Sequence, residues 1–366
     1  MKKTAVFAAT ALFLLTQGCS RHTPPEGQTE AITPADSGQT PILPAIDADV
    51  YSVSPTEPRD VLVVAAASGL EWDESLSGAA ANLAIDLSSN TPIDAASVRW
   101  AGLKSGWPYP ITYAGMELVA HQANCPPSLL ENIPSHSHVG IARARGAAAD
   151  AWVVLSTDVQ RVAEPFSNSQ ELNTVFGLPF SNSEGLSFRA FGATGEMQSG
   201  SSVTFDHEGE WVIEVIDDNL QSLLLRAAIY VDGESPDYAP IEAVSSFSED
   251  IDGEILSMVN EVRAHFVDGY LNNEPLLTST ARRSLQAWME EGTPSPPHDE
   301  LGTVTLTGAP TTSVICVGET PRACIDQIYW SAQQRGALLN ANLSGAGVAS
   351  QIVDGRIHAV IHLAGQ

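Results

Sequence analysis

The sequence predicts an α+β protein in which two α/β units flank a small antiparallel β-sandwich. Three observations support this fold class: apolar residues at helical spacing in the outer thirds, short alternating runs in the middle, and similar closing strands in the two outer segments. A length of 366 residues with 43% hydrophobic residues is sufficient for two or three packed domains.

The first outer segment, residues 56–161, begins with two helical patterns. Apolar residues at helical spacing predict a helix over 70–87, which a nearby proline ends. A second helix is predicted over 94–104 because an aspartate cap precedes it and a glycine follows it. The apolar runs 138–143 and 151–155 then predict two strands joined by a Gly- and Ala-rich turn.

The middle segment, residues 162–242, has only strand signals. Short runs separated by turn sequences predict strands at 186–191, 202–205, 210–216 and 223–231. Apolar and polar residues alternate in the third of these runs, which is typical of a half-buried strand. Strands of this length and spacing predict a small Ig-like antiparallel sandwich.

The last segment, residues 243–366, returns to helical patterns. Predicted helices cover 255–266, 279–291 and 325–339, and predicted strands cover 345–350 and 356–363 around an Asp-Gly turn. Its closing strands resemble those of the first segment: 346–349 is similar to 138–142, and 360–363 to 152–155. The order of elements therefore indicates an internal duplication around a β insert.

Residues 1–19 have the pattern of a bacterial lipoprotein signal peptide. A dilysine start is followed by an apolar stretch over 5–15 and by Gly18 before Cys19, which would carry the lipid. The stretch is too short to span a bilayer as a mature helix. Thr16 stands where such signals usually have Leu, which leaves a plain secretory signal as the alternative.

Residues 20–55 are rich in Pro, Thr, Gln and Gly and predict a disordered tether. Together with Cys19 they place the protein on a membrane, in the periplasm or at the outer membrane or cell surface. The net charge of -27 would repel phosphate backbones, so nucleic acid is excluded as a partner. The acidic residues are scattered, which indicates a solubility role rather than a cation site.

The cysteines agree with export. Cys316 and Cys324 are close enough in sequence to form a disulfide in an oxidising compartment, and Cys125 would be a buried thiol. A metal site at the first two cysteines is the weaker alternative, since no second Cys pair or His cluster lies nearby in the sequence.

A family resemblance rests on four pieces of the last segment, in order. They are an apolar pair followed by Asn-Glu-x-Arg over 258–264, a helix pattern over 275–287, Trp-x-x-x-x-Arg-x-x-Leu-Leu over 330–339, and Gly-Ala-Gly-Val-Ala over 345–349. This region resembles the CAP superfamily of SCP-like, cysteine-rich secretory and pathogenesis-related proteins. The resemblance implies an α-β-α sandwich, and the first segment matches it in outline only.

The resemblance also implies a cavity with two His and two acidic residues that can hold a divalent metal. His298 stands for the first His, Glu319 for one acid, and Gln334 occupies the place of the second His. A Gln amide is a poor zinc ligand and no general base near neutral pH. We therefore expect a degenerate site and no cofactor beyond a weakly bound divalent ion.

Other candidate chemistry is sparse. His136 and His138 would share one face of an extended strand, as would His358 and His362, but packing explains both pairs without a ligand. The run Trp107-Pro108-Tyr109-Pro110 is a candidate for presenting rings to solvent, although core packing is the simpler interpretation for the aromatic residues of this segment.

These observations favour a non-enzymatic envelope lipoprotein that acts in binding or adhesion through a degenerate CAP-type unit. Its partners would be the membrane, through the lipid, and a protein, lipid or glycan ligand. Two alternatives stay open: a metal-dependent hydrolase that uses His298 and Glu319, and a lipid or sterol carrier. The first alternative requires those two side chains to meet in one pocket.

Overall fold

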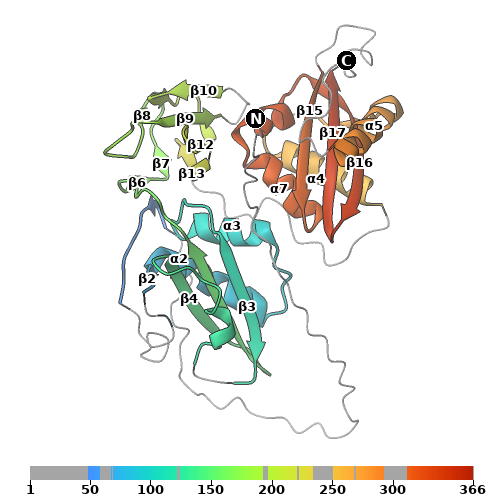
Figure 1. Ribbon diagram of the computed structural model, residues 1–366. Coiled ribbons are helices and arrows are strands. Elements are labelled where there is room, and N and C mark those ends of the chain that lie inside the picture. The colour runs from blue at the N-terminus through green and yellow to red at the C-terminus, as the bar shows by residue number, and fades with distance from the viewer. Residues whose placement is uncertain are drawn as a thin grey trace, which may run out of the picture.

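The computed structural model describes residues 48–57, 67, 69–121, 124–192, 197–220, 222–233, 250–267, 269–291 and 311–365. Signal peptide, most of the tether and His298 lie outside the described residues. The α+β class predicted from the sequence is confirmed, since the chain contains both helices and several small sheets (Figure 1).

The first α/β unit is a four-stranded sheet with two helices on one face. Its elements are β2 (Glu71–Trp72), α2 (Glu74–Ser88), α3 (Ala95–Lys104), β3 (Tyr113–Val119), the 3-10 helix η1 (Pro127–Leu129), β4 (His138–Arg145) and β5 (Asp150–Thr157). The strand order is β2-β4-β5-β3, and α2 lies against β4 and β5. The segment around η1 covers the opposite face, where Leu129 and Leu130 pack with Val139 and Trp152.

Side-chain caps set the starts of both helices in this unit. Asp73 accepts a hydrogen bond from Leu76 N at 2.9 Å, and Asp94 accepts one from Ser97 N at 2.9 Å. Each bond satisfies a donor that the first helical turn leaves without a partner. The cap at Asp73 also explains why the predicted helix over 70–87 is shorter at its start: Glu71 and Trp72 pair with β4 instead.

The middle region is a β-sandwich. Its main sheet, in the order β10-β9-β12-β13-β7, consists of β7 (Ser169–Gln170), β9 (Leu186–Phe191), β10 (Met197–Gly200), β12 (Gly209–Asp217) and β13 (Ser222–Val231). Two small sheets complete it, one of β8 (Val175–Gly177) with β11 (Ser202–Thr204), the other of β1 (Val50–Tyr51) with β6 (Phe166–Ser167). All four predicted strands are present.

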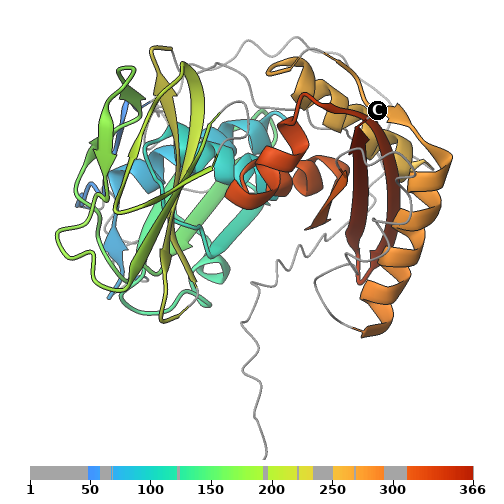
Figure 2. The ribbon, with the colours of Figure 1, turned by 90° about the horizontal axis from the view of Figure 1, so that it is seen from above.

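The last α/β unit has helices on both faces of its sheet. Its elements are α4 (Ile251–Ala264), β14 (Asn272–Asn273), α5 (Pro275–Glu291), β15 (Thr311–Gly318), α7 (Pro321–Tyr329), α8 (Ala332–Leu339), β16 (Leu343–Val353) and β17 (Arg356–Gly365). The strand order is β14-β16-β17-β15. α5 covers one face, and α4 and α7 cover the other, which gives three layers (Figure 2).

Two details of this unit differ from the sequence prediction. The helix predicted over 325–339 is divided into α7 and α8: Trp330 ends the first helix, and its indole Nε1 donates to Asp326 Oδ1 one turn earlier, at 2.9 Å. Ser331 is extended and starts the second helix in a new direction. Strand β15, like β3 in the first unit, was not predicted; both are outer strands of their sheets.

The three regions share one continuous hydrophobic core. Helices α3, α7 and α8 lie at its centre: α7 contacts α3, and α8 contacts β9, β10 and β12 of the sandwich. None of the described helices is both long enough and apolar enough to cross a membrane. The division of the chain into domains with the predicted boundaries remains a prediction.

Candidate functional site

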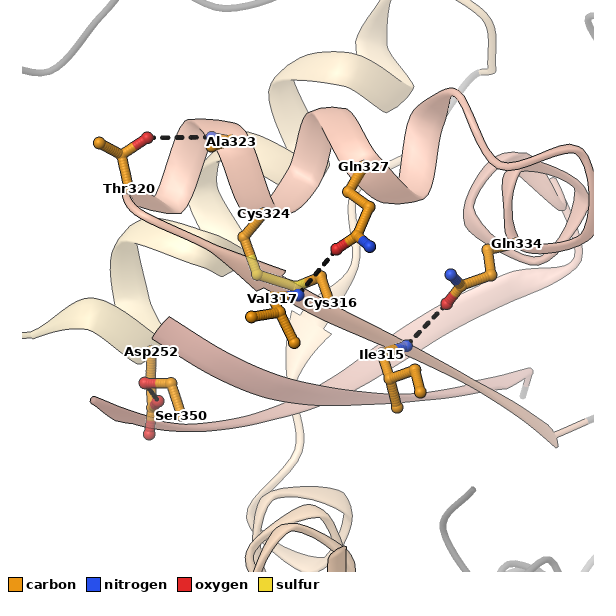
Figure 3. The surroundings of a disulfide bond; sticks show 10 residues. All are labelled: Asp252, Ile315, Cys316, Val317, Thr320, Ala323, Cys324, Gln327, Gln334 and Ser350. Carbon is orange, nitrogen blue, oxygen red and sulfur yellow. Dashed lines mark hydrogen bonds between the residues drawn. A yellow bond between two sulfur atoms is a disulfide. The ribbon is translucent and has the colours of Figure 1, made fainter. Parts of the chain in front are cut away.

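The region to which the family resemblance points is built on β15, α7 and α8. Among the described residues, strand β15 is the outermost strand of its sheet and pairs with β17 alone. Cys316 in β15 forms a disulfide with Cys324 in α7, across a Cα–Cα distance of 5.1 Å, as the sequence predicted (Figure 3). Thr320 caps α7 by accepting from Ala323 N, so the helix returns directly alongside the strand.

Two glutamine side chains close the free edge of β15. Gln334 Oε1 accepts a hydrogen bond from Ile315 N at 2.7 Å, and Gln327 Oε1 accepts one from Val317 N at 2.8 Å (Figure 3). An outer strand otherwise presents unpaired N–H groups, which invite pairing with another chain. The two amides therefore take the place of a neighbouring strand, and they fix α7 and α8 to the sheet edge.

Helix α8 is held against the sandwich by a buried ion pair. The guanidinium of Arg335 is fully buried and donates from Nη1 to Glu210 Oε1 in β12 at 3.0 Å. Tyr329 Oη donates to the same carboxylate oxygen, and its ring lies 4.1 Å from the Arg335 Cζ atom. Charge-assisted bonds of this kind are strong when both partners are desolvated and well aligned.

Helix α7 is held against the first unit by a second group of polar contacts. Asp326 is buried, pairs with Arg99 of α3 and accepts from the Trp330 indole. Burial raises the pKa of the Asp326 carboxyl, while the positive charge of Arg99 opposes that rise. Thr320 Oγ1 adds a bond to Asp94 Oδ2 at 2.9 Å. The polar groups of α7 and α8 thus join the three regions to one another.

The three predicted cavity residues have different environments. His298 lies outside the described residues. Gln334 contacts β15 at Ile315, four residues before Glu319, which follows the end of the strand. Glu319 Oε2 is buried and has no hydrogen-bond partner among the described residues. Within that part of the chain, no three His, Cys, Asp or Glu side chains are grouped as metal ligands.

The remaining candidates from the sequence are four histidines, which differ in burial and in the side chains that they contact. His138 is buried, 3.4 Å from Glu71 through Nε2 and Oε2, whereas His136 is exposed at a positive φ of 69°. His362 is fully buried and its Nε2 lies 3.1 Å from Ser284 Oγ; burial lowers its pKa to about 4. His358 packs on the Trp288 ring at 5.3 Å.

The loop after α3 does not present its rings to solvent. Trp107 and Tyr109 are 1% and 6% exposed, so the prediction of an exposed aromatic loop is wrong and the core-packing alternative is correct. The two rings contact each other at 5.1 Å, and Tyr109 Oη accepts from Ala163 N. Both rings therefore lie on the inner side of the loop. Cys125 is buried and outside the disulfide, as expected.

Sequence reasoning did not identify Glu210 and Arg335 as a pair that joins the last unit to the sandwich. Arg335 was quoted only as part of a family motif, and Glu210 only as the start of a strand. A basic residue between apolar positions of a helix, in a chain with only 17 Lys and Arg, is the signal that points to a buried pair. Its partner is 125 residues away and is found only in the fold.

Comparison with known proteins gives structural matches alone. No family model matches the chain, and no curated protein sequence matches it. A cysteine-rich secretory protein of Staphylococcus aureus is similar over 89% of this chain and 98% of its own, with 10% identity and a TM-score of 0.28. An extracellular SCP-domain protein of Bacillus anthracis is similar over 62% of this chain and 81% of its own, with 12% identity and a TM-score of 0.28.

A third match is an outer surface protein of Borrelia burgdorferi, which covers 33% of this chain and 96% of its own, with 14% identity and a TM-score of 0.29. Two of the three matches are named as SCP-domain or cysteine-rich secretory proteins, the family that the last segment resembles. With scores this low, the matches support no conclusion about ligand, partner or activity.

Proposed function

We propose that this chain is an exported, non-catalytic binding protein in which the CAP-like unit acts as a scaffold. One observation carries the proposal: Gln334, at the place of the family's second His, accepts from Ile315 N at 2.7 Å. Its carbonyl oxygen is committed to the sheet edge, and its helix lies between that edge and the sandwich. A group in this position serves packing, and an amide at position 334 provides no imidazole to hold a metal or move a proton.

The buried charges near α7 and α8 support the same proposal. Arg335 and Asp326 are each paired and buried at contacts between regions. Catalytic carboxylates and bases need access to a substrate. Here the charged groups contact other parts of the same chain, so they stabilise the arrangement of the three regions.

Export and membrane attachment form the second half of the proposal. Cys19 would carry the lipid and residues 20–55 would separate the folded part from the membrane. Expression in a bacterial host with a radiolabelled fatty acid tests this directly. We expect label and membrane association in the wild type and neither in Cys19→Ser; a labelled Cys19→Ser would contradict the assignment.

Zinc titration distinguishes a scaffold from a metal-dependent hydrolase. We expect no calorimetric zinc binding by the wild type at micromolar concentrations, nor by Gln334→His, which restores a family-type imidazole. Micromolar zinc binding by the wild type that is lost in both His298→Ala and Glu319→Ala would overturn the proposal. Circular dichroism of each variant controls for folding.

A further inference from the structure

A small pocket lies between the first α/β unit and the β-sandwich. Its volume is about 190 Å³, and its walls come from α3, the loop that follows α3, and β13. Most of the wall is apolar, with Trp107, Ile111 and Leu223 among its members. The polar side chains in the wall with a formal charge are Arg99 and Arg226. A protein with a net charge of -27 thus places two guanidinium groups at one apolar pocket.

Both arginines are fixed in place by carboxylates behind them. Arg226 donates from Nε and Nη2 to Glu214 Oε1, at 2.9 and 2.6 Å. Arg99 donates from Nη1 to Asp326. A guanidinium group carries five N–H donors, so each arginine retains donors beyond these bonds. Burial lowers the pKa of Arg226, Glu214 opposes that shift, and the charge of Arg99 adds to it, as expected for two cations at one site.

The chemistry of the wall defines the ligand. Guanidinium groups donate hydrogen bonds and accept none, so the complementary group is an acceptor, and a carboxylate fits best. The apolar wall requires a compact apolar body. A cavity of about 150 Å³ is sufficient for a benzene ring, so 190 Å³ is sufficient for a ring with a carboxylate attached.

We propose that this pocket binds a small monocarboxylate with a compact apolar body, of the size of benzoate. The apolar part would pack against Trp107, Ile111 and Leu223, and the carboxylate would meet Arg99 and Arg226. The proposal rests on the proposed function as a binding protein and names a ligand class for it. The pocket also joins α3 to β13, so an occupant would stabilise the contact between the two regions.

Calorimetry with benzoate and benzyl alcohol tests the charge requirement in the full-length wild type. The two probes have similar apolar bodies, but only benzoate carries the negative charge. We expect benzoate to bind at least about tenfold more tightly, because hydrogen bonds to a charged group contribute more than neutral ones. Equal affinity for the two probes, or no binding of benzoate, would overturn the proposal.

Two variants locate the binding. Arg99→Gln should weaken benzoate at least about tenfold. Arg161→Gln is its control, since Arg161 has a similar exposed fraction and also faces a carboxylate, 3.5 Å away, but does not line the pocket. Ala95→Phe keeps both arginines and fills the half-buried start of α3, so it should abolish binding of both probes. Unchanged benzoate affinity in folded Ala95→Phe would place the ligand elsewhere and contradict the assignment.

Failure here is distinguishable from failure of the proposed function. If benzoate does not bind to the wild type, the pocket assignment is wrong, and the zinc titration still decides whether the protein is a scaffold. Conversely, zinc binding through His298 and Glu319 would overturn the scaffold function whatever benzoate does.

Discussion

The first and last α/β units share one frame, a four-stranded sheet with a long helix on one face, and they differ in what covers the other face. Their sheets have the orders β2-β4-β5-β3 and β14-β16-β17-β15, with a two-residue parallel strand at one edge in both. In each unit a long helix follows that short strand and covers one face. The correspondence extends the similarity of closing strands seen in the sequence to the complete order of strands.

Glycines mark the same contact in both units. A Cβ atom on Gly140 would lie 2.2 Å from the carbonyl carbon of Leu76 in α2, and one on Gly347 would lie 2.1 Å from that of Leu277 in α5. The helix therefore rests directly on the strand at one equivalent point in each unit, where no side chain fits.

Equivalent positions next to this contact differ in polarity. Gly140 pairs with Leu155, and Gly347 pairs with His362. The equivalent helix positions, two turns further along, also differ. Leu83 lies seven residues after Leu76, whereas Ser284, the partner of His362, lies seven residues after Leu277. The first unit thus buries two leucines where the last unit buries an imidazole and a hydroxyl.

The second face shows the larger difference. In the first unit it is covered by the short segment around η1, which forms its own small core with the sheet. In the last unit it is covered by α4 and α7 and belongs to the continuous core of the whole chain. The same sheet with its helix can therefore have a local cover on its second face or form a contact between regions there, depending on the segments that precede and follow its strands.

The largest expected effect comes from breaking the Arg335–Glu210 pair, through which the last unit contacts the sandwich. Arg335→Met leaves the Glu210 carboxylate buried without its cation, so the free energy of unfolding should fall by about 3–5 kcal/mol in chemical denaturation. Arg161→Met, at a partly exposed pair, should change it by less than about 1 kcal/mol. A loss below about 1 kcal/mol in Arg335→Met would mean that α8 is not held by this pair.

The close contact between a glycine and a helix gives the next test, with one substitution in each unit. Gly140→Ala and Gly347→Ala force the helix away from the strand and should each cost about 3 kcal/mol. Gly177→Ala in β8 is the control, because a Cβ there has nothing within 4 Å. Tolerance of one substitution but not the other would show that the two frames are not equivalent.

Acid should destabilise the last unit through His362. Its pKa is about 4 in the fold and about 6.5 when unfolded, so the unfolded chain binds the extra proton between these values. The contribution of the neutral, buried His362 to the free energy of unfolding is fully present above pH 6.5. It is lost, by about 3 kcal/mol in total, as the pH drops through 4. His362→Leu with Ser284→Ala makes the site resemble the first unit and should flatten this part of the curve. An unchanged pH dependence would exclude His362 as its origin.

The smallest expected effect concerns the edge of β15. Gln334→Ala leaves Ile315 N without its acceptor and should cost about 1–2 kcal/mol. Gln286→Ala removes an exposed amide that contacts Glu290, and should change stability by less than about 0.5 kcal/mol. Equal effects of the two variants in urea denaturation would mean that the Gln334 bond contributes nothing specific.

Local signals predicted the elements that have strong patterns. Helix α3 and strand β9 begin and end within a residue of their predictions, because a side-chain cap and a run of apolar residues define them. Outer strand β3 was missed, since it is only partly buried and its pattern is weak, whereas β15 was missed although it contains the apolar run 314–317. The break between α7 and α8 comes where Trp330 ends α7 and Ser331 is extended, and the apolar periodicity does not reveal it.

The candidate site was predicted less well than the fold. The disulfide of Cys316 follows from two nearby cysteines, and it was identified. The roles of Gln334 and Arg335 depend on partners 19 and 125 residues away, so residue type alone does not assign them. Sequence did indicate that a Gln at this place is a poor metal ligand, but not that its amide would close a sheet edge.

Hydrogen exchange at β15 tests the central claim most directly, that α7 and α8 are a fixed cover of this edge. By the alternation of an antiparallel strand, Val314 and Cys316 point their N–H groups toward β17, and Ile315 and Val317 point theirs toward the two glutamines. We predict that the Ile315 and Val317 amides exchange as slowly as those of Val314 and Cys316. Exchange of Ile315 and Val317 that is faster by orders of magnitude would show that the cover opens, and would contradict a scaffold in which this face is committed to packing.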